Sequence, residues 1–308
     1  MKSIAIDFGG TRIKLALFDD GVIVKKASIP AFSENGLAQR LRDTEDAIRK
    51  MLSGDNIRDY AGIGISTTGA VDPVTKRISS LYGKNEDASQ INLSAWCENA
   101  FGLPMAIETD SKLALLGEIN FGCGKGYRDA VILTFGTGIG TAVMIGGKLL
   151  SSRNNVAGTL SSHIIVDTRG RKCTCPNIGC MEASACGWAL EELAREHTGF
   201  VDSGLATEEK IDFRALEKWY VQGDRTAAEI VKHSVEYWRA GILNMIHAYD
   251  PALVILGGGV MKFQGLYEML TEGLSERIWD CCGNVETSLA EHPEDCVLYG
   301  LYHIVCGQ

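Results

Sequence analysis

Two short glycine-rich segments each follow an apolar run, and their residue types suit the binding of phosphate. Adjacent glycines let the backbone approach a ligand closely and present its N–H groups to that ligand. An acid at the end of a strand, with basic residues just past the turn, suits a magnesium ion and its phosphates. The alternative is an ordinary hairpin turn, because short glycine-rich matches are common. The first segment reads Asp7, Phe8, Gly9, Gly10, Thr11 and Arg12.

The second segment repeats this plan near the middle of the chain. An apolar run at 131–135 leads into Gly136, Thr137 and Gly138, and both glycine segments are followed by two more apolar runs with a short turn between them. Two copies, each opening one half of the chain, indicate a duplicated domain with phosphate loops that face each other across a cleft. This arrangement resembles that of the superfamily of sugar kinases, actin and heat-shock ATPases. The resemblance implies an α/β fold with two ribonuclease H-like, actin-like ATPase domains around that cleft.

A cluster of cysteines predicts a metal site. Cys173, Cys175 and Cys180 lie in one short loop with the spacing Cys-x-Cys-x4-Cys, and His163 lies upstream at a predicted strand edge. Three thiolates and one imidazole complete the tetrahedral ligand set of Zn²⁺, and a site with no open position is structural rather than catalytic. The alternative is a set of free cysteines, although three thiols packed so closely are reactive without a metal.

Length and composition exclude several classes of function. The 308 residues are enough for two domains with their own cores. The net charge of −9 argues against a nucleic-acid interface, which needs a basic face. No apolar run is long enough to span a bilayer, and the chain opens directly on a predicted strand without the pattern of a signal peptide. We therefore expect a cytoplasmic protein that binds neither nucleic acid nor membranes.

Apolar periodicity places further candidate residues at the ends of strands. Two strands, predicted at 61–66 and 105–108, each end in polar residues. In open α/β sheets, ligands bind at the carboxyl ends of such strands. A third apolar strand, predicted at 251–256, ends in a glycine triplet that opens a predicted helix. The residues at these three ends are Thr68 and Gly69, Thr109 and Asp110, and Gly257, Gly258 and Gly259.

Amphipathic segments predict the helices that surround these strands. We place the domain boundary in glycine-rich sequence, so that residues 1–117 and 292–308 form the first α/β domain. Residues 118–291 then form a larger α/β domain that carries the cysteine loop. Helices are expected at 36–52, 93–101, 183–197, 213–222, 226–249, 262–279 and 294–305, the last of them packing back on the first domain.

Taken together, these motifs resemble the ROK family of bacterial kinases and repressors. The motifs are Asp-x-Gly-Gly-Thr from Asp7, Gly-Thr-Gly-Ile-Gly from Gly136, and His…Cys-x-Cys-x4-Cys-x-Glu from His163 to Glu182. Repressor members carry a winged helix–turn–helix ahead of the first motif, and the first strand here starts at residue 3. We therefore expect the kinase branch, which phosphorylates sugars or amino sugars with ATP and Mg²⁺. The resemblance also implies a homodimer.

The resemblance implies a role for each candidate residue. Asp110 stands in the family's Glu-Asn-Asp motif and would be the catalytic base, accepting the proton of the sugar hydroxyl as that hydroxyl attacks the γ-phosphate. The alternative is that Asp110 is the N-cap of the helix beginning at Ser111. Asp7 would organise the water shell of Mg²⁺. The residues that would hold phosphate are Gly9, Gly10, Thr11 and Arg12 on one side and Gly136, Thr137 and Gly138 on the other. The triplet Gly257, Gly258 and Gly259 would border the adenosine. The alternative for this triplet is a tight strand-to-helix turn that needs glycine for packing.

The expected sugar site departs from the family pattern. Thr109 stands where relatives have an asparagine, and Leu160 stands where they have a carboxylate. Each lost hydrogen bond to a buried hydroxyl costs about 1–3 kcal/mol, so we expect a different or modified sugar, or a weak kinase. The alternative function is a sugar- or nucleotide-binding regulator that has lost turnover. The expected substrate contacts are Thr68, Gly69, Thr109, Asp110, His163 and Glu182, with His163 using one ring nitrogen for substrate and the other for zinc.

Overall fold

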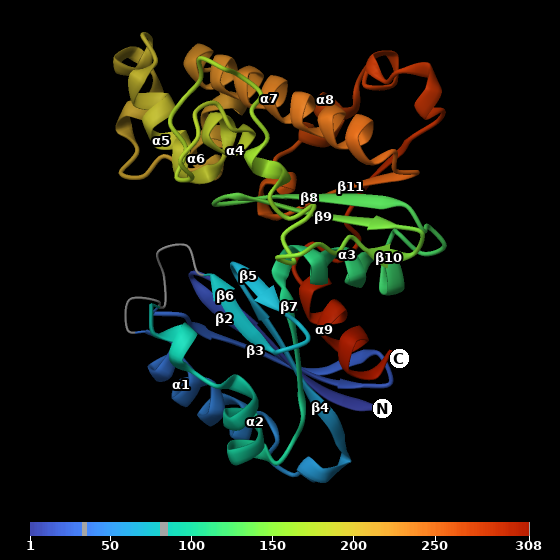
Figure 1. Cartoon of the computed structure of the whole chain (residues 1–308). Coiled ribbons are helices and arrows are strands. Elements are labelled where there is room, and N and C mark those ends of the chain that lie inside the picture. Colours follow the sequence, from blue (N-terminus) through green and yellow to red (C-terminus); the bar gives the residue numbers. More distant parts are fainter. Residues whose placement is uncertain (33–35, 81–85, 308) are drawn as a thin grey trace. The chain divides into compact units, whose positions relative to one another are not determined.

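The structure is a computed structural model that describes residues 1–32, 36–80 and 86–307 (Figure 1). The chain divides into two compact units. The first comprises Met1–Lys125, Ser151–Val156 and Glu294–Gln308, and the second comprises Gly126–Leu150 and Ala157–Pro293. Residues 118–125 and 151–156 thus lie in the first unit, whereas the sequence analysis placed them in the second. The reason for the first difference is that the helix beginning at Asp110 continues past residue 117 to Phe121.

One mixed sheet forms the centre of the first unit. Its strand order is β3-β2-β1-β4-β7, in which β1, β2 and β3 are antiparallel and β4 and β7 run parallel to β1. A short hairpin, β5 (Ala70–Asp72) and β6 (Arg77–Ser80), follows β4. The five sheet strands are β1 (Lys2–Phe8), β2 (Arg12–Asp19), β3 (Val22–Pro30), β4 (Tyr60–Thr67) and β7 (Met105–Thr109).

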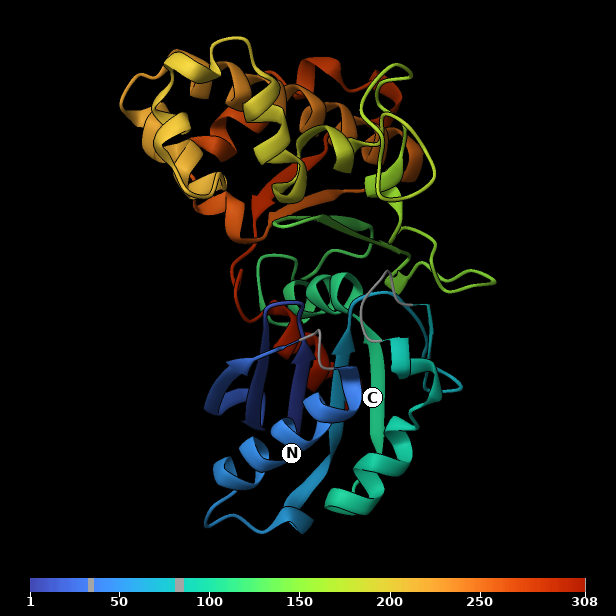
Figure 2. The same ribbon diagram turned by 90° about the vertical axis from the view of Figure 1, so that its left-hand side faces the viewer.

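Alternating side chains of these strands pack on two helical layers. On one face, Ile4 and Ile6 share a core with α1 (Gly36–Met51) and α2 (Leu93–Phe101), the two helices in front of the blue strands in Figure 2. On the opposite face, Ala5 packs with α3 (Asp110–Phe121) and α9 (Cys296–Cys306). This alternation is the period of two that a pleated strand imposes on its side chains.

Glycines bring α3 and α9 into close contact. A Cβ atom at Gly117 would lie 2.0 Å from the carbonyl oxygen of Cys296, and one at Gly300 would lie 2.1 Å from that of Leu113. Neither position can carry a side chain in this packing, since real Cβ atoms do not approach an oxygen so closely. The prediction that the final helix packs on the first domain is therefore confirmed.

The second unit repeats the sheet of the first. Its strand order is β10-β9-β8-β11-β12, with β9 and β10 in an antiparallel hairpin arrangement and β11 and β12 parallel to β8. The predicted duplication is thus visible as two sheets with the same sequence of antiparallel and parallel neighbours. The strands are β8 (Ala130–Phe135), β9 (Ile139–Ile145), β10 (Lys148–Leu149), β11 (Leu253–Gly257) and β12 (Glu286–Leu289).

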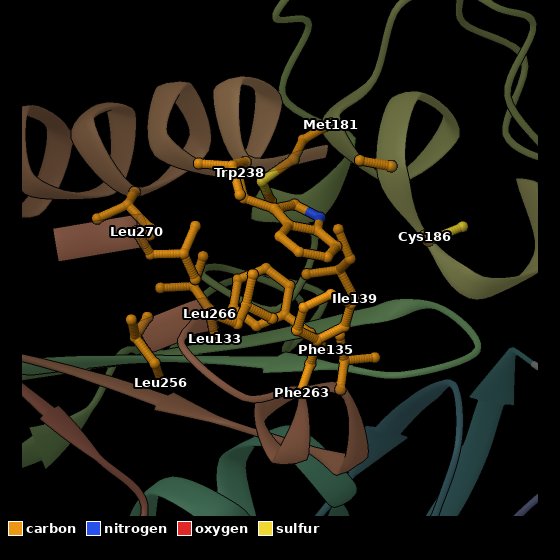
Figure 3. Packing of buried hydrophobic residues seen from close by; sticks show 14 of the residues in the cluster. Leu133, Phe135, Ile139, Met181, Cys186, Trp238, Leu256, Phe263, Leu266 and Leu270 are labelled. Atoms are coloured by element: carbon orange, nitrogen blue, oxygen red, sulfur yellow. The ribbon is translucent and has the colours of Figure 1, made fainter. Parts of the chain in front are cut away.

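Helices cover this sheet around a large apolar core, shown in Figure 3. The indole of Trp238, on the long helix α7, lies 4.9 Å from the ring of Phe135 on β8, and Leu266 and Leu270 of α8 belong to the same core. The helices are α4 (Met181–Ala185), α5 (Gly187–Glu196), α6 (Phe213–Val221), α7 (Arg225–Tyr249) and α8 (Leu266–Thr271).

Two predicted helices are interrupted. The one expected at 183–197 is split by Cys186, whose backbone is extended, into α4 and α5. The one expected at 262–279 is reduced to α8 and two single turns, η7 (Gly259–Lys262) and η8 (Ser275–Arg277). Gly265 and Gly273 flank α8 with positive φ, a left-handed conformation that ends a helix. The predictions at 36–52, 93–101, 213–222, 226–249 and 294–305 are confirmed to within two residues.

Across the described ranges, no helix combines the length and the apolar character needed to cross a membrane.

Candidate functional site

In the first unit, three parallel strands end at one edge of the sheet. Phe8 of β1 pairs with Thr67 of β4, and Thr67 pairs with Thr109 of β7. The residues that directly follow these partners are Gly9, Thr68 and Asp110. The topology therefore brings together candidates that lie about a hundred residues apart in sequence, at the edge where α/β sheets bind ligands.

Asp110 is the first residue of α3 and not its N-cap. The N-cap is Thr109, which makes no side-chain capping bond, while the Asp110 carboxylate accepts a hydrogen bond of 2.7 Å from the N–H of Ser111. The alternative interpretation of Asp110 as the N-cap is therefore wrong. Burial and the negative charge of Asp7 raise the pKa of Asp110 to about 6, and only the Ser111 N–H opposes them. A carboxylate with a pKa near neutrality is suited to accept a proton at physiological pH.

Asp7 lies among cationic side chains. In the register of β1 and β2 it is paired with Lys14, whose ammonium group donates to the carbonyl oxygen of Glu294 at 2.6 Å. Burial raises the pKa of the Asp7 carboxyl, and Ser66, Lys14 and Arg40 oppose that rise. Lys14 was not among the predicted site residues. Its signal was its position two residues after Arg12, which places both side chains on one face of the strand.

The first glycine loop has the tight backbone that the sequence predicted. The Gly9 N–H donates to the Asp7 carbonyl oxygen at 3.0 Å, and a Cβ atom at Gly9 would lie 2.7 Å from the carbonyl oxygen of Arg12. Among the residues that the structure describes, the N–H groups of Gly10 and Thr11 meet no acceptor. Such N–H groups are the donors that an anion needs. The guanidinium of Arg12, in contrast, bonds Ser28 on β3, with Nε 2.7 Å from its hydroxyl oxygen.

Arg40 is a buried cation beneath this loop that sequence reasoning missed. Its side chain is 2% exposed, and Nη2 donates to the Gly9 carbonyl oxygen at 2.8 Å. The guanidinium also lies 5.3 Å from the ring centre of Phe8. Burial lowers the pKa of Arg40, against the charges of Asp7 and Asp87. The missed signal is that Arg40 belongs to the buried stripe of α1, where the pattern calls for an apolar residue.

A second buried cation, Lys112, lies in the first turn of α3. Its Nζ is 3.5 Å from Oε1 of Glu108 and donates to the Asn155 carbonyl oxygen at 3.0 Å. The same carboxylate oxygen accepts from the backbone N–H of Thr109 at 2.8 Å and from its hydroxyl at 3.1 Å. The Thr109 hydroxyl, predicted to contact substrate, is therefore bonded to Glu108. Lys112 also fixes segment 151–156 to the first unit.

In the second unit, the other two glycine segments lie side by side. β11 runs parallel to β8, with Gly257 opposite Thr134, so both strands end at the same edge. Gly258 has φ +89°, and a Cβ atom there would lie 2.3 Å from the carbonyl oxygen of Phe135. The tight-turn interpretation of this triplet therefore holds at Gly258, although the turn opens η7 and not a long helix.

The loop from Gly136 to Gly138 is closed by its own backbone and by α5. The Gly136 N–H donates to the Gly138 carbonyl oxygen at 2.9 Å, and the N–H groups of Gly187 and Trp188 donate to the carbonyl oxygens of Gly136 and Thr137. Within the described ranges, the N–H groups of Thr137 and Gly138 meet no acceptor, as in the first loop. Glu182, predicted to contact sugar, is hydrogen-bonded to Ile139 at the end of this loop.

Four predicted metal ligands converge in the second unit. Their ligand atoms all lie within 4.8 Å of one another, with Cys173 Sγ 3.4 Å from His163 Nδ1 and Cys175 Sγ 3.5 Å from Cys180 Sγ. His163 ends the 3-10 turn η4 (Ser161–His163), and Cys180 immediately precedes α4. A set of three sulfur atoms and one imidazole nitrogen at these distances could hold a tetrahedral zinc ion.

The chain resembles known sugar kinases over nearly its full length. A model of the ROK family matches residues 3–305. A glucokinase of Thermotoga maritima is 32% identical over 286 residues, covering 91% of this chain and 88% of the relative, and an N-acetylmannosamine kinase of Pasteurella multocida is 26% identical, covering 97% and 95%. A ROK family glucokinase from Streptomyces griseus, solved in complex with glucose and AMPPNP, matches with a TM-score of 0.82 and 25% identity over 99% of each chain. The predicted α/β fold of two ribonuclease H-like, actin-like ATPase domains is confirmed.

Proposed function

Because this chain belongs to the ROK family, we propose that it is an ATP-dependent carbohydrate kinase that phosphorylates a hydroxyl group of a hexose or amino sugar. The observation that carries the proposal is Asp110, a carboxylate with a pKa of about 6 at the ligand-binding edge of the first sheet. Asp7 and a glycine loop with available N–H groups lie at the same edge.

Each step assigned to the chain's own residues has a physical reason. Asp110 accepts the proton of the sugar hydroxyl as the oxygen attacks the γ-phosphate, because a hydroxyl is a poor nucleophile while it keeps that proton. In the first unit, the N–H groups of Gly10 and Thr11, with the charge of Lys14, hold phosphate oxygens. In the second unit, Thr137 and Gly138 do the same, and the triplet from Gly257 borders the adenosine. Asp7 would organise the water shell of Mg²⁺, and that ion would neutralise charge on the phosphates.

We further propose that His163, Cys173, Cys175 and Cys180 hold a structural Zn²⁺. The distances among their ligand atoms and the sulfur-rich donor set suit that ion. His163 Nδ1 lies 3.4 Å from Cys173 Sγ, so we assign Nδ1 to the metal and Nε2 to substrate. We also propose a homodimer, as the family resemblance implies. Light scattering tests this assignment, and a solution mass of 33.3 kDa, that of one chain, contradicts it.

The acceptor sugar is proposed to differ from unmodified glucose. The Thr109 hydroxyl is committed to Glu108, and Leu160, which precedes η4, offers an apolar side chain without a hydrogen-bonding group. Losing a hydrogen bond to a buried sugar hydroxyl costs about 1–3 kcal/mol, which is roughly a tenfold to hundredfold loss in affinity. A glucose activity equal to that of the ordinary glucokinases contradicts this part of the proposal.

A panel of hexoses and amino sugars with ATP and Mg²⁺, measured as ADP release, tests the activity. The variant Asp110→Asn should lower kcat by about 10²- to 10⁴-fold while leaving nucleotide and sugar binding nearly intact. Binding of nucleotide and sugar with no ADP release from the wild-type chain for any sugar would instead favour a regulator without turnover.

A further inference from the structure

We propose that the Cys–His cluster sets the shape of the loop from Gly136 to Gly138, and hence nucleotide affinity, through the positioning residues Glu182 and Trp188. The inference rests on the proposed function, which assigns nucleotide phosphates to that loop. The cluster is His163, Cys173, Cys175 and Cys180.

The cluster and the loop share one short stretch of chain. Cys180 is the N-cap of α4, Glu182 lies in the first turn of α4, and α5 begins at Gly187 directly after the break at Cys186. Cys180, Met181 and Cys186 are buried, whereas Glu182 and Gly187 are partly exposed. A displacement of Cys180 is therefore expected to move the first turns of α4 and α5 as well, because close-packed interiors transmit strain.

Both carboxylate oxygens of Glu182 accept hydrogen bonds from residues next to the loop. Oε2 accepts from the N–H of Ile139 at 3.1 Å, and Oε1 accepts from the indole Nε1–H of Trp188 at 3.3 Å. A Cβ atom at Gly138 would lie 3.1 Å from Oε2, so this carboxylate lies against the loop itself. The contacts place Glu182 as a support of the loop, in addition to any contact it makes with substrate.

Trp188 contacts both the loop and the cluster. Its backbone N–H donates to the Thr137 carbonyl oxygen at 2.9 Å, and its indole packs against the apolar surface of Cys173, Cys180 and Ala183. One residue, through its backbone N–H and its side chain, thus joins the glycine loop to the sulfur ligands.

Gly187 makes the approach of α5 to the loop possible. Its N–H donates to the Gly136 carbonyl oxygen at 3.0 Å, and a Cβ atom at Gly187 would lie 2.7 Å from that same oxygen. The carbonyl groups of Gly136 and Thr137 are consequently held toward α5. Since a peptide unit is planar, holding a carbonyl also fixes the N–H of the next residue, which here belongs to Thr137 or Gly138.

Coupling between the cluster and the loop can be measured in two ways, as an effect of metal on nucleotide affinity and as an effect of nucleotide on metal affinity. If metal binding orders the loop for nucleotide, nucleotide binding must retain metal by the same factor. Couplings of this kind are about 5- to 150-fold. We expect the affinity for Mg²⁺·AMPPNP to fall about tenfold in Trp188→Phe, which removes the indole N–H and keeps an aromatic ring.

The experiment uses the full chain loaded with zinc. Calorimetry gives the affinity for Mg²⁺·AMPPNP, and transfer of zinc to a coloured chelator gives its release rate with and without the nucleotide. The matched control is Trp219→Phe, because the Trp219 indole also donates to a carboxylate, that of Glu208 at 2.8 Å. In the part of the chain that the structure describes, the side-chain hydrogen bonds of Trp219 and Glu208 involve neither the loop nor the cluster. We expect AMPPNP to slow zinc release in the wild type and in Trp219→Phe, and to do so much less in Trp188→Phe and Glu182→Gln.

The outcomes separate this inference from the proposed function. If Mg²⁺·AMPPNP does not bind the wild-type chain, the proposed function fails first. If it binds with the same affinity in the wild type and in Trp188→Phe, and leaves zinc release unchanged, the coupling is refuted while the kinase assignment stands. Circular dichroism identifies a variant that has unfolded, and in that case the zinc release of the folded wild type with and without nucleotide decides the question alone.

Discussion

The guanidinium of Arg40 holds the carbonyl oxygen of Gly9 at 2.8 Å from within the core of the first unit. A buried hydrogen bond from a charged donor contributes about 1.5–3 kcal/mol, and this one fixes the first peptide of the proposed phosphate loop.

Replacing Arg40 by methionine should therefore weaken ATP binding. The Gly9 carbonyl loses its donor and Asp7 loses a nearby positive charge, so we expect KM for ATP to rise about tenfold and the free energy of unfolding to fall by about 1–3 kcal/mol. Steady-state kinetics and urea denaturation measure the two effects. Arg42→Met, on the exposed side of the same helix, is the matched control and should change neither. An unchanged KM in Arg40→Met contradicts the positioning role.

The carboxyl group of Asp110 should make the protein less stable as the pH rises. Its folded pKa of about 6 lies above its usual value, so the folded state binds this proton more tightly than the unfolded state does. The resulting stability is complete below about pH 4 and is lost as the pH rises through about 6. At neutral pH, Asp110→Asn should consequently be more stable than the wild type by roughly 1–3 kcal/mol, despite its lower kcat.

Denaturation at a series of pH values checks this prediction, since the gain should disappear near pH 4. Asp72→Asn is the contrasting control, because hydrogen bonds from Thr75 and Val74 lower the pKa of the exposed Asp72 carboxyl. It should give no gain in stability at any pH. If the wild type is instead more stable than Asp110→Asn at neutral pH, ionised Asp110 does not lower the free energy of unfolding and the prediction is wrong.

The buried pair of Glu108 and Lys112 should be sensitive to the loss of one partner only. Lys112→Met leaves the Glu108 carboxylate buried without its cation, which typically costs about 3–5 kcal/mol. Removing both charges in Glu108→Gln/Lys112→Met should restore part of that loss. The exposed pair of Lys25 and Asp55 provides the comparison, and Lys25→Met should cost less than about 1 kcal/mol. Equal losses in the two lysine variants, measured by urea denaturation, would contradict the assignment of a buried ion pair.

Zinc content should depend on the four cluster residues and on no other cysteine. Elemental analysis of the purified chain should give about one zinc per chain, and Cys175→Ser should lower this value several-fold because one of four ligands is lost. Cys281→Ser, which changes an exposed cysteine outside the cluster, should leave it unchanged. Retention of full zinc content in Cys175→Ser would mean that the metal is bound elsewhere.

The sequence predicted the strand ends well because glycine position and apolar runs are local signals. It placed Asp110 correctly after a strand, but it did not show that Thr109, one residue earlier, would be the N-cap. Arg40 and Lys112 were missed for a common reason. Their local signals were a charged residue in the buried stripe of α1 for Arg40 and a pair four residues apart, Glu108 and Lys112. Those signals did not reveal the distant partners, which are Gly9 for Arg40 and Asn155 for Lys112. The break at Cys186 lies beside a non-local contact, that of Gly187 with Gly136. The break at Gly265 had a local signal, since glycine adopts positive φ readily.

The glycine contact between α3 and α9 has a consequence for synthesis on the ribosome. The first unit needs residues from 294 onward to cover one face of its sheet, yet it is separated from them by most of the second unit. At about 5–20 residues per second, roughly ten to thirty seconds pass between the emergence of α3 and that of α9. During that interval Ala5, Ala16 and Phe18 lack their final cover, so the half that is translated first is the half that matures last.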